Sequence, residues 1–202
     1  MQASGLTARA LFCRRGDRPL FGGLDLWLER GAALHLVGPN GIGKTSLLQI
    51  LAGLRRPDRA VSPDGARETR GSIHWTGTVG LLDERPALDP DLPLGKALGF
   101  WSRLDRAQPA LDAVGLARIA EVPVRYLSTG QRKRAGWARL LAQGCDHWLL
   151  DEPFNGLDSD SRAIVEDLMR QRREGGGVLV IASHQPFAGE AIEPLDLRDH
   201  PW

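Results

Sequence analysis

The chain has 202 residues, of which 42% are apolar and 25% are charged, and its formal net charge at pH 7 is +1. These proportions are typical of a globular protein with one well-packed core, and the near-neutral charge gives no support to a nucleic-acid partner. No apolar run approaches the roughly 20 residues that a membrane-spanning helix needs, so we expect no membrane span.

Two strands are predicted at the start of the chain. Leu6 to Cys13 predicts a short strand, Arg14 to Pro19 a turn, and Leu24 to Glu29 a second strand that ends at Arg30-Gly31. A simple nucleotide kinase begins with its phosphate-binding strand almost at once. Two strands of antiparallel type at the start therefore argue against that class.

The segment from Gly38 to Thr45 carries the strongest chemical signal. It follows an apolar run, Ala33 to Val37, and leads into the apolar pattern of Ser46 to Leu51. It fits the phosphate-loop pattern of glycine, four residues and Gly-Lys-Thr, in the strand–loop–helix context that the pattern requires. Glycines allow backbone N–H groups to point at an anion, and the helix N-terminus adds the positive end of its dipole. The predicted nucleotide-binding residues of this segment are Gly38, Pro39, Asn40, Gly41, Ile42, Gly43, Lys44, Thr45 and Ser46.

Two of these side chains have distinct predicted roles. The Lys44 ammonium would reach the β- and γ-phosphates of a nucleoside triphosphate, and the Thr45 hydroxyl would ligate Mg²⁺. The sequence therefore predicts a site for a nucleoside triphosphate and its magnesium ion.

The middle of the chain predicts a loop, two strands and a helical block. Arg55 to Arg70 is rich in Pro, Gly, Asp and Arg and predicts an exposed loop. Gly71 to Trp75 and Thr78 to Leu82 predict short strands. From Leu94 to Ala120, apolar residues recur at three- and four-residue spacing, which is typical of helices.

A loop then gives way to another predicted helix at Ser128-Thr129-Gly130-Gln131, where Ser128 would cap the helix. A capped helix with no further role remains an alternative for this segment. The charge run Arg132-Lys133-Arg134 predicts a solvated or phosphate-facing edge of the helix.

A second chemical cluster follows at Asp151 and Glu152, which end the apolar run His147 to Leu150. Beside a phosphate loop, Asp151 would hold Mg²⁺ directly or through water, and Glu152 would act on an attacking water as a general base. A strand followed by a plain polar turn is the alternative.

The last motifs surround one more helix and one more strand. Asn155 to Asp158 precedes a helix that we expect to end near Glu174, with Asp158 or Ser159 as its cap. Val178 to Ser183 predicts a buried strand that ends at His184. Because ligands of open parallel sheets bind at the carboxyl ends of the strands, His184 would lie near a γ-phosphate.

In this order, the motifs resemble those of the ATP-binding subunits of ABC transporters. Gly38 to Thr45 resembles the Walker A loop, and Ser128 to Gln131 is similar to the Leu-Ser-Gly-Gly-Gln signature, with Thr129 in a glycine position. Asp151 and Glu152 match the Walker B acid and the catalytic glutamate. Asn155 to Asp158 resembles the D-loop and His184 the switch histidine.

The resemblance implies an α/β fold, that of a P-loop NTPase with a mixed parallel core sheet, a small antiparallel β subdomain and an inserted helical subdomain. A single ATP-binding domain would span residues 1–202, with the helical subdomain at about 86–145. The ligands would be ATP and Mg²⁺. Two copies would form a head-to-tail homodimer on ATP binding, with each ATP held between Walker A of one subunit and the signature helix of the other.

Two positions depart from the family pattern. The family usually stacks adenine on an aromatic residue where this chain has Arg15; a guanidinium can stack on a base, and Phe12 and Phe21 are other candidates. The family also places a Gln after the strand that here ends at Leu82. This chain has Asp83-Glu84-Arg85 instead, so the group that replaces the Gln stays open.

A narrower resemblance is to the haem exporter ATP-binding proteins of the cytochrome c maturation protein A family. It rests on Leu11 to Phe21, Gly38 to Leu48, Asp151 to Phe154 and Ala182 to Pro186. It implies a peripheral protein at the cytoplasmic face of the bacterial inner membrane, with integral membrane permease subunits in separate chains. ATP hydrolysis would drive haem delivery or release for c-type cytochrome assembly, without direct haem ligation by this chain. The alternatives are an exporter of another substrate and a non-transport ABC ATPase.

Overall fold

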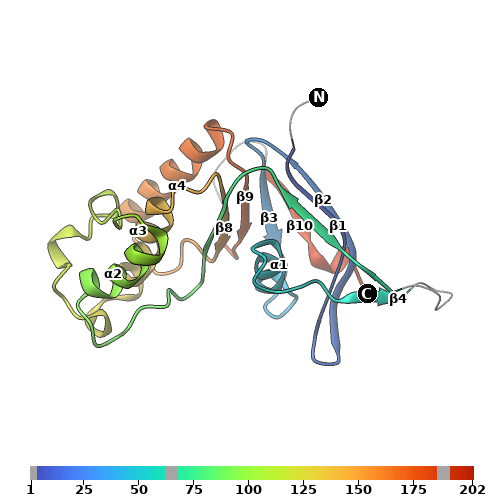
Figure 1. Ribbon diagram of the computed structural model, residues 1–202, viewed down its shortest axis with the longest axis horizontal. Helices are drawn as coiled ribbons and strands as arrows, with labels where there is room; N and C mark the ends of the chain where they lie inside the picture. Colours follow the sequence, from blue (N-terminus) through green and yellow to red (C-terminus); the bar gives the residue numbers. More distant parts are fainter. Residues whose placement is uncertain (1–3, 62–67, 186–191) are drawn as a thin grey trace.

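The computed structural model describes residues 4–61, 68–185 and 192–202 (Figure 1). Met1–Ala3, Pro186 and the middle of the predicted loop, 62–67, lie outside the described residues. The strands are β1 (Ser4–Arg15), β2 (Arg18–Glu29), β3 (Ala33–Val37), β4 (Arg59–Val61), β5 (Glu68–Arg70), β6 (Ser72–Trp75), β7 (Val79–Leu82), β8 (His147–Asp151), β9 (Leu179–Ala182) and β10 (Ile192–Asp196). The helices are α1 (Lys44–Leu51), α2 (Leu94–Asp105), α3 (Thr129–Ala142) and α4 (Ser159–Glu174), with short 3-10 turns η1 (Asp112–Val114), η2 (Ala117–Ile119), η3 (Val124–Tyr126) and η4 (Leu197–Asp199).

The central sheet has the strand order β10-β3-β9-β8-β7, and its described pairs are all parallel. Leu36 of β3 and Asp151 of β8 are both in register with Ala182 of β9. The carboxyl ends of these three strands therefore meet at one edge of the sheet. The segments that follow them begin with Gly38, Glu152 and Ser183.

Side chains of the central strands alternate between two hydrophobic clusters. In β8, Trp148 and Leu150 pack with helices α2, α3 and α4, whereas Leu149 packs with α1 and the strands β1 and β2. The same alternation divides Ile181 from Val180 in β9. The sheet is thus buried on both faces, with the helical block on one side and α1 with the antiparallel strands on the other (Figure 1).

The antiparallel sheet has the order β2-β1-β6. Strands β1 and β2 are longer than predicted because only Gly16 and Asp17 form the turn, so that Arg15 pairs with Arg18. Gly16 has a φ of 59°, which an L side chain rarely adopts. This tight turn carries Arg15 to the end of β1.

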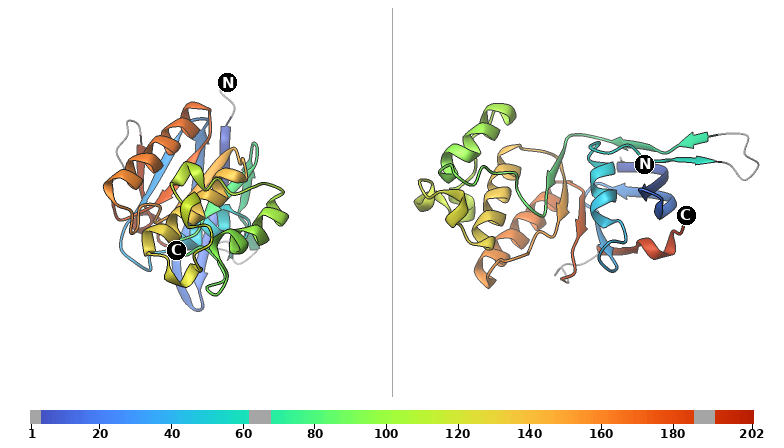
Figure 2. Two further views of the ribbon diagram at one scale, coloured as in Figure 1. Left: turned by 90° about the vertical axis from the view of Figure 1, so that its left-hand side faces the viewer. Right: turned by 90° about the horizontal axis from the view of Figure 1, so that it is seen from below.

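Three strands were not predicted, namely β4 and β5 of one hairpin and β10 of the central sheet, and each has a physical reason. In the predicted loop 55–70, β4 and β5 form an antiparallel ladder, which backbone groups make without an apolar side-chain pattern. Figure 2 shows this hairpin projecting from the end of the molecule opposite the helical block. Strand β10 contains Pro194, which is tolerated because β10 lies at the edge of the central sheet.

Residues 94–120 were predicted as helical, but only α2 is an α-helix. Pro109 and Gly115, whose φ is 67°, interrupt the pattern, and the 3-10 turns η1 and η2 follow. Helices α2 and α3 both lie within the 86–145 range. The fold class, α/β with a core sheet, a small antiparallel sheet and a helical block, is confirmed, but the described pairs of the core sheet are all parallel and not mixed. None of the helices in the described part of the chain combines the length and apolarity that crossing a membrane requires.

Candidate active site

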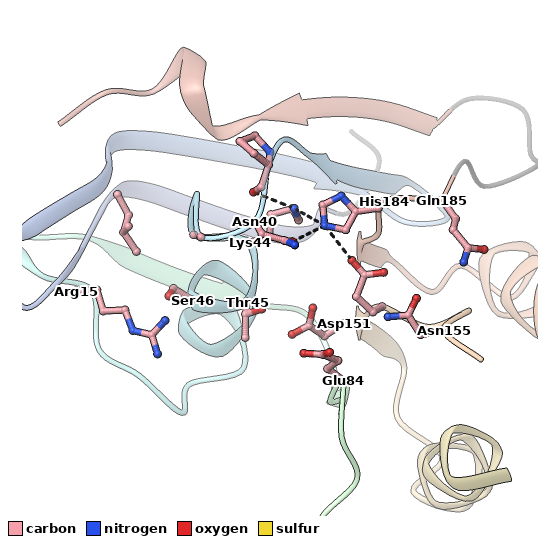
Figure 3. A pocket seen from close by; sticks show the side chains of 15 residues that line it. Arg15, Asn40, Lys44, Thr45, Ser46, Glu84, Asp151, Asn155, His184 and Gln185 are labelled. Atoms are coloured by element: carbon pink, nitrogen blue, oxygen red, sulfur yellow. Dashed lines mark hydrogen bonds and ion pairs between the residues drawn. The ribbon is translucent and has the colours of Figure 1, made fainter. Parts of the chain in front are cut away.

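A pocket opens at the edge where the ends of β3, β8 and β9 meet (Figure 3). Its described lining residues are Arg15, Leu20, Pro39, Asn40, Gly41, Gly43, Lys44, Thr45, Ser46, Glu84, Asp151, Glu152, Asn155, His184 and Gln185. Most of the predicted nucleotide-binding and catalytic residues therefore surround one cavity. Gly38 and Ile42 of the same loop are not among the described lining residues, and Ile42 packs against the core.

The backbone of the phosphate loop takes conformations that only glycine adopts readily. Gly38, Gly41 and Gly43 have φ values of 115°, 79° and 123°. Helix α1 begins directly after Gly43, and among the described residues no side chain caps its first turn. The first N–H groups of α1 therefore face the pocket as donors for an anion.

Lys44 lies across this loop and is only 7% exposed. Its Nζ donates to the carbonyl oxygen of Gly38 at 2.6 Å and to that of Pro39 at 3.3 Å. Burial lowers the pKa of Lys44, whereas the nearby carboxylates of Glu152, Asp151 and, less strongly, Asp196 oppose that shift. The ammonium is thus held among backbone acceptors beside the two acids.

Thr45 and Asp151, which the sequence predicts as ligands of Mg²⁺, both line the pocket. Burial raises the pKa of Asp151, and the nearby Thr45 hydroxyl opposes that shift by favouring the ionised carboxylate. Hydroxyl and carboxylate oxygens are the ligands that Mg²⁺ prefers, and a cation would offset the cost of burying the carboxylate. The residues present therefore fit Mg²⁺.

Glu152 is a non-glycine residue with a φ of 46°. Its N–H donates to the carbonyl oxygen of Ala182 at 2.8 Å, so β9 holds it in this conformation. Nε2 of His184 lies 2.6 Å from Oδ1 of Asn40 and 3.6 Å from Oε1 of Glu152 (Figure 3). Left-handed backbone at a non-glycine residue costs roughly 1–3 kcal/mol and clusters at functional sites.

Three polar residues of the pocket had no predicted role of their own, namely Glu84, Asn155 and Gln185. Glu84 belongs to the segment where the family pattern has a Gln, and it lies beside Asp151 in Figure 3. The missing Gln could have pointed to Glu84, because in this segment the chain has carboxylates where the family pattern has an amide.

The pocket distinguishes among the residues proposed to contact adenine. Arg15 and Leu20 line it, both from the β1–β2 hairpin. Phe21 is fully buried beneath Gly43, and Phe12 packs edge-to-face against Trp202. Of the three candidates, only Arg15 is placed to meet a nucleotide.

The signature segment lies elsewhere. Ser128 Oγ accepts from the N–H of Gln131 at 3.1 Å, and the Gln131 side chain accepts from the N–H of Ser128 at 2.8 Å. This capping box starts α3. None of Ser128, Thr129, Gly130 and Gln131 belongs to the described residues that line the pocket.

The segment from Asn155 to Asp158, which resembles the D-loop, leads from the pocket that Asn155 lines to the start of α4. Asp158 caps α4 by accepting from the N–H of Ser161 at 2.8 Å, and the bonds with Ser161 lower the pKa of Asp158. A Cβ built on Gly130 would collide with the carbonyl oxygen of Gly156. The signature helix and the D-loop are therefore in close backbone contact.

The prediction of a solvated edge at Arg132-Lys133-Arg134 was wrong for Lys133, which is 2% exposed. Its ammonium donates to three backbone carbonyl oxygens, and this supply of acceptors allows a lysine to be buried. Burial lowers the pKa of Lys133 to about 8.

Comparison with known proteins gives the family. The profile described as ABC transporter matches residues 21–155. CcmA of Novosphingobium aromaticivorans, a cytochrome c biogenesis ATP-binding export protein, is 48% identical over 199 residues, covering 98% of this chain and 98% of that protein. CcmA of Zymomonas mobilis is 44% identical over 199 residues, covering 96% of this chain and 85% of that protein.

Solved structures show the same fold. A solved ATP-binding subunit of an ABC transporter has a TM-score of 0.72 at 20% identity, covering 89% of this chain and 79% of that chain. The cbiO1 protein of Clostridium perfringens, part of the ABC transporter complex cbiONQ, has a TM-score of 0.66 at 21% identity. The match covers 90% of this chain and 79% of that chain. The chain therefore belongs to the ABC transporter family, as an ATP-hydrolysing ATP-binding subunit of the CcmA type.

Proposed function

We propose that two copies of this chain bind ATP between them and drive haem delivery or release for c-type cytochrome assembly, together with separate membrane permease subunits. The observation that supports a dimer is that the predicted ATP-binding segments of one chain do not all meet in one pocket. The phosphate loop, Asp151 and Glu152 surround one pocket, whereas the signature segment Ser128–Gln131 lies outside it on the same chain. A second copy would bring its own signature helix to the open side of the pocket.

In the proposed reaction, the phosphates of ATP take the place of backbone acceptors. Lys44 would leave the carbonyl oxygens of Gly38 and Pro39 for the β- and γ-phosphates, and the N–H groups at the start of α1 would bind the same anion. Thr45 and Asp151 would hold Mg²⁺, which neutralises phosphate charge when it is bound.

Hydrolysis would depend on Glu152 and His184. Glu152, whose backbone N–H donates to Ala182 of β9, would accept a proton from an attacking water, and His184 would donate a hydrogen bond to the γ-phosphate. The partner's α3 would present its N-terminus to the same phosphate, with the positive end of its dipole.

The cargo and the partners are proposed from the relatives named cytochrome c biogenesis ATP-binding export proteins. Two histidines support a role without direct haem ligation. His35 bonds the carbonyl oxygen of Ser183 at 3.0 Å, and both nitrogens of His147 are bonded, to Thr76 and Val178. The place of work would be the cytoplasmic face of the bacterial inner membrane.

The direct test of the site is Glu152→Gln. We expect ATP hydrolysis to fall by at least about 100-fold, since a general base contributes about 10²–10⁴-fold, while ATP binding is retained. Phosphate release and calorimetric titration with ATP would measure the two quantities. The control is Glu121→Gln at an exposed position, which should hydrolyse ATP like the wild type. Unchanged hydrolysis in Glu152→Gln would remove Glu152 from the reaction.

The haem role has its own test. In a bacterium whose equivalent gene is deleted, the wild-type chain should restore c-type cytochromes, seen by haem staining, and Glu152→Gln should not. Copurification from detergent-solubilised membranes would identify the permease subunits. Failure of the active wild-type chain to restore the cytochromes would favour an exporter of another substrate.

A further inference from the structure

Lys133 joins three parts of the molecule that are distant in the sequence. It lies in α3 two residues after the signature segment, and its Nζ donates to the carbonyl oxygens of Glu84 at 2.8 Å, Asp83 at 3.2 Å and Asp151 at 3.2 Å. An ammonium has three donors, so these three acceptors satisfy it completely.

Two of the three acceptors belong to residues that line the nucleotide pocket, Glu84 and Asp151. Asp83 and Glu84 directly follow β7, and Asp151 ends β8 and precedes Glu152. The side chains of Glu84, Asp151 and Glu152 line the pocket. A movement of Lys133 would therefore shift the backbone that carries three acidic groups of the site.

The positive charge of Lys133 lies near four acidic side chains of the site. Four acids lie near the ammonium, and each of them favours the charged form of Lys133. They are Asp151, Glu84, Glu152 and Asp83. Burial opposes that form, but the side chain remains paired with carbonyl oxygens. Lys133 thus offsets part of the acidic charge from beneath the site.

The same helix contacts the site a second time, at its first turn. Gly130 and Gly156 of the D-loop approach so closely that neither accommodates a Cβ. Thr129 also packs here, since a Cβ built on Gly156 would lie 2.9 Å from its Cγ2. Helix α3 is therefore attached to its own subunit's site at two places, and Lys133 makes the polar attachment.

We propose that Lys133 is a positioning residue that couples engagement of α3 with the partner's ATP to hydrolysis in its own subunit. The inference rests on the proposed dimer, in which the N-terminus of α3 contacts the partner's nucleotide. Once that contact fixes α3, Lys133 holds the backbone of Glu84 and Asp151 in the arrangement that hydrolysis requires. Each site is then active when the other is occupied.

The test measures ATP hydrolysis against ATP concentration in Lys133→Met, Lys133→Arg and, as a matched control, Lys96→Met at an exposed position in α2. For Lys133→Met we expect kcat to fall about tenfold or more and the Hill coefficient to fall from that of the wild type to about 1, within the usual range of coupling energies. The affinity for ATP should change less than about threefold, because the ammonium does not line the pocket. Lys133→Arg, which retains the charge and several donors, should recover part of both quantities, and Lys96→Met should behave like the wild type.

Two further measurements separate the possible failures. If Lys133→Met does not fold, by thermal unfolding, Lys133→Gln replaces it, because an amide keeps two of the three donors. Wild-type cooperativity and kcat in the folded variant would overturn the role of Lys133, as would an equal loss of ATP affinity and kcat. If Glu152→Gln does not dimerise on addition of ATP, the result contradicts the proposed dimer and not the role of Lys133. A wild-type kcat in Lys133→Met would contradict the coupling in either case.

Discussion

Arg15 is the side chain on which recognition of the nucleotide base would depend. It ends β1, at the rim of the pocket, and its guanidinium is planar. We predict that Arg15→Ala raises the dissociation constant for ATP about fivefold, since a stacked cation contributes about 1 kcal/mol. Calorimetric titration with ATP would measure the change.

Two controls make this prediction specific. Arg15→Tyr supplies an aromatic face at the same place and should bind ATP with the affinity of the wild type. Binding of pyrophosphate, which has no base, should be the same in all three proteins. A pyrophosphate affinity that falls together with that of ATP would show that Arg15 binds phosphate instead of adenine.

Three site residues that the sequence predicted share one property, which the buried Lys133 lacks. Lys44, Asp151 and His184 each follow an apolar strand, and parallel strands bring their carboxyl ends together whatever the rest of the chain does. The burial of Lys133 depends instead on carbonyl groups of residues 50, 49 and 18 positions away, which a charge run does not reveal. Pairing at such distances is a property of the folded chain.

At the scale of the elements, the approach of α3 to the D-loop leaves no room for a side chain at Gly130. We predict that Gly130→Ala lowers the free energy of unfolding by about 1–3 kcal/mol, because the methyl group would meet the carbonyl oxygen of Gly156 and force the two elements apart. Urea unfolding would measure the change, and ATP hydrolysis should fall with it.

The matched control is Gly99→Ala in helix α2. A Cβ there would meet no described atom within 4 Å, so alanine should stabilise the protein by ~0.5–1 kcal/mol through helix propensity. Equal stabilisation by the two substitutions would contradict the packing of α3 against the D-loop.

Elements made of continuous apolar runs were predicted well, whereas the periodic spacing of 94–120 predicted more helix than α2 and strands with little pattern were missed. The central strands β3, β8 and β9 are buried on both faces and read as continuous apolar runs, so their positions follow from the sequence. Strands β4, β5 and β10 are at edges or in a separate hairpin, where backbone pairing suffices and side chains carry little pattern. Their formation depends on the strand beside them.

At the scale of the whole molecule, the signature helix lies outside the pocket of its own chain, so in a dimer its N-terminus would have to face the nucleotide of the partner. Ser128 caps α3, and in the proposed dimer it would also face the partner's phosphate. Aspartate is an equally good cap but carries a negative charge. We predict that Ser128→Asp, introduced into Glu152→Gln, prevents the ATP-dependent dimer by repulsion from the partner's phosphates, with the free energy of unfolding changed by less than ~0.5 kcal/mol.

Light scattering with and without ATP would measure the dimer, and urea unfolding would measure the fold. Glu152→Gln alone should become dimeric on addition of ATP, and its combination with Ser128→Thr, a neutral cap, should do the same. Because the pocket of each subunit is untouched by Ser128, monomeric Ser128→Asp should still bind ATP. Dimerisation of the aspartate variant at the ATP concentration that suffices for the threonine variant would show that α3 does not face the nucleotide of a second copy.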